Sequence, residues 1–433
     1  MTDESKSHSE KIQLFELNRP DTPVPNKERI LYLDILRGIA ILFIFLANIN
    51  VFSGAYFMSD AEKLSMNTAT LDHVLRVLVF LFVDGKFYSV FSILFGIGFA
   101  VQYQRMKKDD SVFVPFFIKR MAGLILIGGI HLFLLWLGDI LTLYALLGFL
   151  LIFFRHFTNK KLLIWGVILL FMPVIHWLIM YLTNTFYPAN MAGRFFELAG
   201  GILSKESTEG SGSDFSLPVY YTITNFRTWM EVNLHMPLMR LSRILMEGRA
   251  FKVLGLFLIG IYAGRQILEN DLLSNTGLIK KIMLWGLVIG VPMNLLRTWL
   301  EFGSESGGAM SDFLEYLLNF MALTPMALAY CAILALIVTR RKIWLNWFAA
   351  IGRTALSNYL FQTIISIIFF YGIGLGFALS YGFSFSVLFV LIVFALQILF
   401  STLWLRYFRF GPVEWIWRQL TYGKVIGLKK SRS

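Results

Sequence analysis

Long apolar segments recur along the chain and alternate with short polar loops. A helix that crosses a bilayer needs roughly 20 predominantly apolar residues. On this criterion the pattern predicts spans over 31–52, 86–104, 113–135, 138–155, 161–184, 250–267, 279–301, 313–338, 347–371 and 384–408. Residues 70–84 predict an extra half-helix that leads into the second span. The predicted fold class is therefore all-α, a polytopic transmembrane helix bundle of about ten spans.

Composition supports a membrane protein and excludes a soluble one. Of 433 residues, 57% are hydrophobic and 15% are charged, and the mean hydropathy is +0.66. A soluble domain of this size has too little interior to hide so much apolar surface. The net charge of +12 comes from basic residues in short loops, and no solvated basic domain is present, so we predict no nucleic-acid partner.

The distribution of Lys and Arg predicts the orientation of the chain. Loops that carry an excess of these residues face the cytoplasm. Here the N-terminal tail, every second loop and the C-terminal tail are basic, whereas loops 136–137, 302–312 and 372–383 contain no Lys or Arg. This alternation predicts a multi-pass plasma-membrane protein with both termini in the cytoplasm. The long loop 185–249 is the exception, and long loops follow the rule poorly.

The same pattern divides the chain into parts. We predict a disordered cytosolic tail over 1–29, a five-span half over 30–184, an outer loop over 185–249, a second five-span half over 250–424 and a basic cytosolic tail over 425–433. Within the loop, 200–214 reads as a flexible polar stretch, and 219–248 as an amphipathic helix, broken before Pro237. That helix either roofs an outward cavity or rests in the lipid interface.

The first span carries polar side chains that a lipid-facing helix would not tolerate. Asp34 lies one turn before Arg37, and Asn48 follows Arg37 by eleven residues, which returns to almost the same helix face about 16 Å further along. Charged residues inside a membrane are costly and usually mark function. We therefore predict that a polar column from other helices meets this face.

His131 and Asp139 are the strongest candidates for chemistry. The turn between the third and fourth spans lies near Trp136 to Gly138, so both residues are expected at the outer end of a tight hairpin. A carboxylate beside an imidazole orients the ring and raises its basicity, as a general base requires. Alternatively, Asp139 is only an N-cap of the fourth span and His131 hydrogen-bonds a neighbouring backbone group.

Two further spans contain candidate binding residues. Lys86 starts the second span at the outer interface, where it either snorkels or binds an anionic head group or substrate. In the ninth span Thr354, Asn358 and Gln362 share one face, which we expect to meet the polar column of the first span. Arg353 either binds phosphate from the cytosol or is a counter-ion of Asp34.

Small residues and absent motifs narrow the remaining alternatives. Ser92, Gly96 and Ala100 form a stripe on the second span, and Gly260 and Gly264 form a GxxxG motif on the sixth. Such patterns predict close helix packing, within the chain or in a homodimer. The sequence contains no Walker-type loop, no HExxH and no Cys/His metal spacing, so we predict no ATP-driven pump and no metal site.

Six ordered motifs together carry a family resemblance. They are LDILRGIAIL, DGKFYSVFSILFGIG, GGIHLFLLWLGDILTLYALLG, FLIGIYAGR, GRTALSNYLFQ and GPVEWIWRQLTYG. Over about residues 30–424 the chain resembles the bacterial YeiB family, membrane proteins with the domain of unknown function 418 in their C-terminal half. The resemblance implies a bacterial inner-membrane location.

The first span is also similar to that of the wider transmembrane acyltransferase superfamily. The acyltransferase-3 type has an Arg, ten residues and a catalytic His there; Arg37 matches that Arg, and Asn48 occupies the His position. The resemblance implies transfer of an acyl group from cytosolic acyl-coenzyme A to an acceptor on the far side. Because an amide is no general base near pH 7, we expect His131 to serve instead.

The sequence thus supports three functional hypotheses. In the first, an acyltransferase, Arg37 and Arg353 guide acyl-coenzyme A as a co-substrate, Asn48 holds the thioester carbonyl, and His131 with Asp139 deprotonates a small-molecule, glycan or lipid acceptor. The second is a transporter for a small metabolite or lipid. The third is a lipid-binding scaffold or a dimeric partner protein. Membrane lipids are expected partners in each case, and we predict no permanently bound cofactor.

Overall fold

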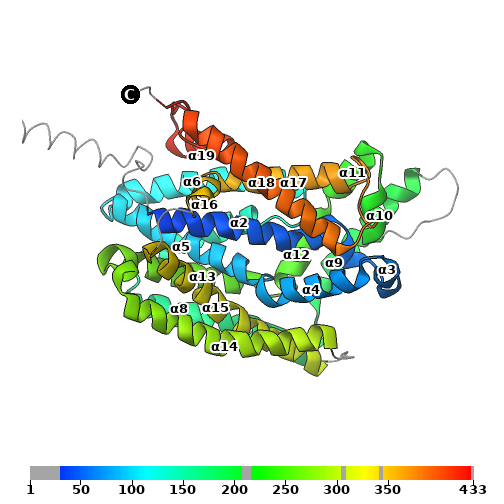
Figure 1. Cartoon of the computed structure of the whole chain (residues 1–433), viewed down its shortest axis with the longest axis horizontal. Helices are drawn as coiled ribbons and strands as arrows, with labels where there is room; N and C mark the ends of the chain where they lie inside the picture. Colours follow the sequence, from blue (N-terminus) through cyan, green and yellow to red (C-terminus); the bar gives the residue numbers. More distant parts are fainter. Residues whose placement is uncertain (1–29, 207–215, 304–308, 341–344, 431–433) are drawn as a thin grey trace, which may run out of the picture.

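The computed structural model describes residues 30–206, 216–303, 309–340 and 345–430, and nearly all of them are helical. Within these ranges the one exception to helix, turn and loop is an isolated bridge between Phe408 and Lys429. The long helices run nearly parallel to one another (Figure 1). The predicted all-α bundle is therefore confirmed. The predicted tail 1–29 lies outside the described residues.

Each predicted span corresponds to a helix or a pair of helices. In chain order these are α2 (Leu31–Phe52), α5 (Lys86–Arg105), α6 (Asp110–Leu134), α7 (Leu141–Phe154), α8 (Asn159–Leu182), α13 (Arg249–Glu269), α14 (Thr276–Gly303), α15 (Ala309–Arg340), α16 (Asn346–Arg353) with α17 (Ala355–Phe370), and α18 (Phe383–Tyr407). Eight helical segments of the described part are long and apolar enough to cross a membrane. The helices α7 and α17, of 14 and 16 residues, are shorter.

The surface of these helices is apolar, as lipid contact requires. Along α18 the side chains of Leu388, Leu391, Leu396 and Leu399 are each more than half exposed. A continuous exposed stripe of this kind favours aggregation in water but is the ordinary lipid-facing surface of a membrane helix. The chain is therefore a membrane-embedded protein.

The expected half-helix is present, and the outer loop contains more structure than expected. Helix α4 (Ala69–Phe82) leads into α5, and is preceded by η2 (Ala55–Phe57) and α3 (Asp60–Ser65). The loop contains α9 (Tyr187–Glu206), α10 (Leu217–Thr222), α11 (Phe226–Asn233) and α12 (Met236–Met246). The break before Pro237 is confirmed. The prediction of one amphipathic helix over 219–248 is wrong, because Asn225 caps a separate helix, α11. The predicted flexible stretch is helical over residues 200–206. Residues 207–214 lie outside the described part.

The remaining elements close the ends of the bundle. The short η3 (Leu272–Ser274) connects α13 to α14, and α19 (Pro412–Tyr422) follows α18. Figure 1 shows α16 and α19 toward one end of the bundle, and α3, α10 and α11 at the opposite end. Two groups of polar side chains lie toward these two ends.

The small-residue stripes of α5 and α13 pack against each other. A Cβ built on Gly96 would lie 2.1 Å from the Phe257 carbonyl oxygen, and one on Gly260 would lie 2.2 Å from the Ile93 carbonyl oxygen. Only glycine allows backbones to approach this closely. The GxxxG motif therefore serves packing within the chain.

Helices α2 and α16 make a second close contact. A Cβ on Gly38 would lie 2.0 Å from the Phe348 carbonyl oxygen, and one on Gly352 would lie 1.8 Å from the Asp34 carbonyl oxygen. These two glycines bring Arg37 and Arg353, their chain neighbours, to the same place in the bundle.

Candidate functional site

His131 and Asp139 form a fully buried pair. His131 Nδ1 lies 2.9 Å from Asp139 Oδ1, and the two side chains are 0% and 1% exposed. Asp139 also accepts hydrogen bonds from the backbone N–H groups of Leu141 (3.1 Å) and Thr142 (2.7 Å). It therefore caps α7 and orients the imidazole at the same time, so the two predicted roles are not alternatives.

The second nitrogen of His131 contacts a hydroxyl group. Nε2 lies 2.9 Å from Oγ1 of Thr363, on α17. Because the Asp139 carboxylate accepts a hydrogen bond, Nδ1 carries the proton, and Nε2 then accepts from the Thr363 hydroxyl. A carboxylate, an imidazole and a hydroxyl in this order have the geometry of a general base beside the proton that it removes.

The pair lies beside the last turn of α2 and under the outer loop. Trp136, whose ring centroid is 6.3 Å from that of His131, stacks on Phe52 at 4.0 Å. From α12, Arg240 donates to the Asp139 carbonyl oxygen at 2.6 Å. Sequence reasoning singled out neither Arg240 nor Thr363 as a site residue. The Arg240 contact favours the predicted role of the loop as a roof over this end of the bundle.

Arg37 belongs to a second polar group, at the start of α2. Its Nη1 donates to Asp34 Oδ1 (2.8 Å) and, weakly, to the Gly352 carbonyl oxygen (3.4 Å). Arg353 lies within electrostatic range of Asp34. The Arg37 side chain remains 29% exposed. Asp34 is thus paired with Arg37 of the same helix, and Arg353 is a second positive charge near this pair.

More arginines surround this second group. Arg120 of α6 lies within electrostatic range of Arg37 and of Arg418 on α19, and its guanidinium stacks on Trp417 at 3.9 Å. Burial lowers the pKa of Arg418, and the nearby cations Arg105 and Arg409 lower it further. We call Arg37, Arg105, Arg120, Arg353, Arg409 and Arg418 the arginine cluster. Sequence reasoning missed Arg120, because a single cation within a span gives no sign of what it faces.

The polar face of α17 does not meet α2, and that prediction is wrong. Asn358 Nδ2 donates to Ser401 (3.0 Å), and Gln362 Nε2 donates to Gln397 (2.9 Å), both on α18. Gln397 in turn donates to the Asn358 carbonyl oxygen at 2.9 Å. The reason is a matching stripe on α18, where Gln397 and Ser401 are one turn apart. The ninth span also breaks at Thr354, which separates α16 from α17.

The two polar groups do not form one column. Arg37 and Phe52 are 15 residues apart on α2, or about 20 Å, and Ile41, Ile44 and Phe45 are buried between them. Asn48 is half-buried, and its side chain makes no hydrogen bond within the described part of the chain. The predicted continuous column is therefore replaced by two groups, joined along α2 by an apolar face.

Lys86 is neither snorkelling nor at the surface. Its side chain is 0% exposed, and Nζ donates to the Phe80 carbonyl oxygen at 2.7 Å. The turn before α5 explains the burial, because Gly85 adopts φ +74° and directs the following residue inward. Lys86 lies within electrostatic range of Asp84, Lys252 and Arg297.

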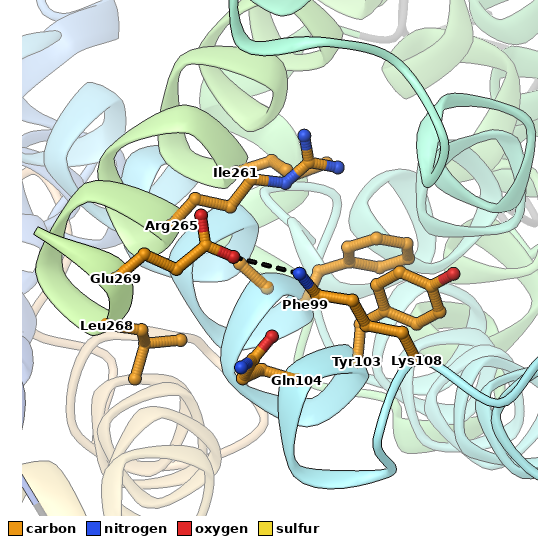
Figure 2. A pocket seen from close by; sticks show the side chains of 9 residues that line it. Phe99, Tyr103, Gln104, Lys108, Ile261, Arg265, Leu268 and Glu269 are labelled. Carbon is orange, nitrogen blue, oxygen red and sulfur yellow. Dashed lines mark hydrogen bonds and ion pairs between the residues drawn. The ribbon is translucent and has the colours of Figure 1, made fainter.

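A small cavity lies between α5 and α13. Figure 2 shows Lys108 paired with Glu269 among the side chains that line it. Its volume is about 10 Å³, the space of roughly one water. Arg265 also lines it, but donates to the carbonyl oxygens of Arg155 (2.7 Å) and Phe157 (2.6 Å). None of the predicted site residues lines this cavity.

Glu414 of α19 caps α17 from a distance in sequence. Its Oε1 accepts from the backbone N–H groups of Leu356 (2.7 Å) and Ser357 (3.1 Å), and the Ser357 hydroxyl donates to Oε2. Burial raises the pKa of Glu414 above its ordinary value of 4.5, against the opposing hydrogen bonds. A carboxyl whose pKa is raised by folding contributes stability below pH 4.5, which is lost as the pH rises through the folded-state pKa.

We therefore expect Glu414→Gln to flatten the pH dependence of stability. Between pH 4.5 and neutrality, the wild-type thermal midpoint should fall relative to that of the variant, because only the wild type must give up this proton. Thermal unfolding in detergent at several pH values measures the difference. Glu231→Gln, at a 45% exposed side chain on α11, is the control. Parallel curves for wild type and Glu414→Gln would refute the assignment.

Comparisons with known proteins agree with the motifs. The family model described as "Protein of unknown function (DUF418)" matches residues 263–424. The chain is 32% identical over 414 residues to "Uncharacterized protein YxaH" of Bacillus subtilis (strain 168), covering 92% of this chain and 96% of the relative. It is 28% identical over 418 residues to "Uncharacterized protein YeiB" of Escherichia coli (strain K12), covering 91% and 96%. The similarity extends over nearly the whole bundle, and the chain belongs to the YeiB family of DUF418 membrane proteins.

Proposed function

We propose that the protein is a transmembrane acyltransferase, which moves an acyl group from acyl-coenzyme A to a hydroxyl acceptor on the opposite side of the membrane. The observation that carries the proposal is the buried Asp139–His131 pair, whose Nε2 lies 2.9 Å from a hydroxyl oxygen. The proposal also rests on the resemblance of the first-span motif to the transmembrane acyltransferase superfamily, in which Arg37 matches the Arg and Asn48 occupies the His position.

The chemistry assigns one role to each group of this pair. An acceptor hydroxyl takes the place of the Thr363 hydroxyl at Nε2, which removes its proton as the oxygen attacks the thioester carbonyl. The new C–O bond forms, the C–S bond breaks, and coenzyme A leaves as a thiolate that takes up a proton. Asp139 stabilises the imidazolium that forms. Asn48 donates to the thioester carbonyl oxygen.

The arginine cluster is suited to the donor. Coenzyme A carries phosphate groups, and arginine binds phosphate with several charge-assisted hydrogen bonds. Arg37 remains partly exposed, so it is accessible to a soluble donor. For the acyl-bearing arm to lie along α2 between the two polar groups, the side chains that bury Ile41, Ile44 and Phe45 must move aside. In this arrangement the arginine cluster faces the cytoplasm with both termini, in the bacterial inner membrane, and His131 lies toward the outer face.

The test is transfer of a labelled acetyl group from coenzyme A to glycan and lipid acceptors by the purified protein. Removal of a general base typically costs 10²- to 10⁴-fold in rate. We therefore expect His131→Ala to lose at least about 100-fold of the transfer, and His176→Ala, at a half-buried histidine of α8, to retain it. Transfer at the wild-type rate by folded His131→Ala would end the proposal.

One observation favours a transporter as the second candidate. The break at Thr354 divides the ninth span into α16 and α17, and discontinuous helices commonly form substrate sites in transporters. Uptake of metabolites into proteoliposomes without coenzyme A separates the two functions, because the acyltransferase does nothing in that assay.

A further inference from the structure

Six charged side chains meet at the junction of three segments of the bundle. Asp84 and Lys86 come from the α4–α5 turn, Glu247, Arg249 and Lys252 from the start of α13, and Arg297 from α14. Each lies within electrostatic range of at least two of the others. We call these six residues the junction cluster. Four basic side chains against two carboxylates leave a formal excess of two positive charges.

Arg297 is buried with most of its hydrogen-bonding capacity unused. It is 7% exposed, and its Nη2 donates to Asp84 Oδ2 at 3.1 Å. Its Nε and Nη1 have no hydrogen-bond partner within the described residues. Its Cζ also lies 3.8 Å from the centroid of the Phe80 ring. A guanidinium that is buried with free N–H groups is costly unless another acceptor supplies the missing bonds.

Lys86 adds a second buried cation beside Arg297. An ammonium group has three protons to donate, and the described residues supply one acceptor, the Phe80 carbonyl oxygen. Helices α5 and α13 both begin at the junction cluster, after Gly85 and Gly248 in the left-handed conformation. Their N-termini add partial positive charge at the same place. An anion at this place would supply the acceptors that these donors lack.

The junction cluster has one accessible side. The carboxylate side chain of Asp84 is 46% exposed and that of Glu247 is 38% exposed, whereas the Arg297 side chain, paired with Asp84, is 8% exposed. Next to Arg297 on α14, Leu295 and Trp299 are 52% and 59% exposed. Each is two residues from Arg297, which places it about 200° around the helix, on the lipid-facing side of α14 and not on the buried side that carries Arg297.

We propose that the junction cluster binds the phosphate group of an acidic phospholipid, whose acyl chains reach the lipid-facing side of α14. A phosphate offers several acceptor oxygens to cations that approach from different helices, and it neutralises the excess charge. The same phosphate chemistry is available from a soluble phosphate ester. This site is independent of the proposed acyl transfer, since neither Lys86 nor Arg297 contacts His131.

The test measures binding of three probes to the full-length protein in neutral detergent: phosphatidylglycerol, phosphatidylcholine and glycerol 3-phosphate. Native mass spectrometry counts retained lipid, and thermal unfolding reports stabilisation. Stabilisation by phosphatidylglycerol alone supports the lipid source. Equal stabilisation by glycerol 3-phosphate supports the phosphate site with a soluble source. No preference for either over phosphatidylcholine overturns the proposal.

Variants assign the binding to the junction cluster. Arg297→Gln should weaken the binding of phosphatidylglycerol at least about tenfold, the effect of losing one charge-assisted contact, and Arg297→Lys should retain most of it. If Arg297→Gln fails to fold, Lys252→Gln, at a half-buried position, tests lipid binding in its place. Arg227→Gln, at an 88% exposed side chain of α11, is the control. Wild-type affinity in both Arg297→Gln and Lys252→Gln would place any lipid elsewhere.

Discussion

Asp139→Ala is expected to lower the free energy of unfolding by about 3–5 kcal/mol, because it leaves several buried donors without acceptors. The carboxylate accepts from the Leu141 and Thr142 N–H groups and from His131 Nδ1. The three donors are buried or half-buried, and alanine replaces none of the acceptors. Each orphaned buried donor costs about 1–3 kcal/mol, and loss of an N-cap alone costs about 1 kcal/mol.

Asp139→Asn is the matched variant for this prediction. The amide keeps one acceptor oxygen and the shape of the side chain, so it should cost clearly less than alanine. Titration of the folded protein with denaturing detergent, followed by circular dichroism, compares the three proteins. An alanine variant as stable as wild type would show that Asp139 holds neither α7 nor His131.

Gly352→Ala is expected to destabilise the bundle by about 3 kcal/mol or more, or to prevent folding, since overpacking against fixed atoms costs 1–3 kcal/mol and occasionally more. The added Cβ would lie 1.8 Å from the Asp34 carbonyl oxygen and 3.0 Å from the Gly38 backbone nitrogen. Both are backbone atoms of α2, which cannot rotate away as a side chain can. The helices must separate, and the Arg37 contact with the Gly352 carbonyl oxygen is then lost.

The chain offers a control for the same substitution. Gly129 lies within α6, and a Cβ built there meets no atom within 4 Å. Gly129→Ala should therefore leave stability unchanged or raise it slightly, because alanine is the better helix former. The yield of monodisperse protein after size exclusion and its unfolding midpoint measure both variants. Equal behaviour of the two would contradict the close contact of α2 with α16.

Periodicity and length predicted the helices well, because each membrane helix satisfies its own backbone and must be apolar along its whole length. The pairing of His131 with Asp139 was also predictable, since eight residues and a short turn place both at one end of a hairpin. The motif with Gly260 predicted close packing, but not the partner, which is the stripe on α5. The sequence shows which helix faces pack closely against another helix, but not which helix that is.

The site predictions that failed involve contacts between distant helices. Gln362 donates a hydrogen bond to Gln397 of α18, whereas the sequence predicted that the polar face of α17 meets α2. Lys86 is fully buried, because the conformation of Gly85 turns it inward. Arg240 reaches Asp139 from a loop that is 101 residues away in the sequence. Hydrogen-bonding capacity is readable from the sequence, but the choice among several suitable partners depends on how whole helices pack.

The most direct test of the account is sidedness of transfer across a sealed membrane. Proteoliposomes that enclose labelled acetyl-coenzyme A, with the arginine cluster facing inward, are supplied with hydroxyl acceptors outside. The account predicts that label appears on the outer acceptor, and that both Arg37→Gln and His131→Ala abolish its appearance. If vesicles with folded wild-type protein never label any acceptor outside while the donor remains intact inside, the two polar groups are not the ends of one catalytic path.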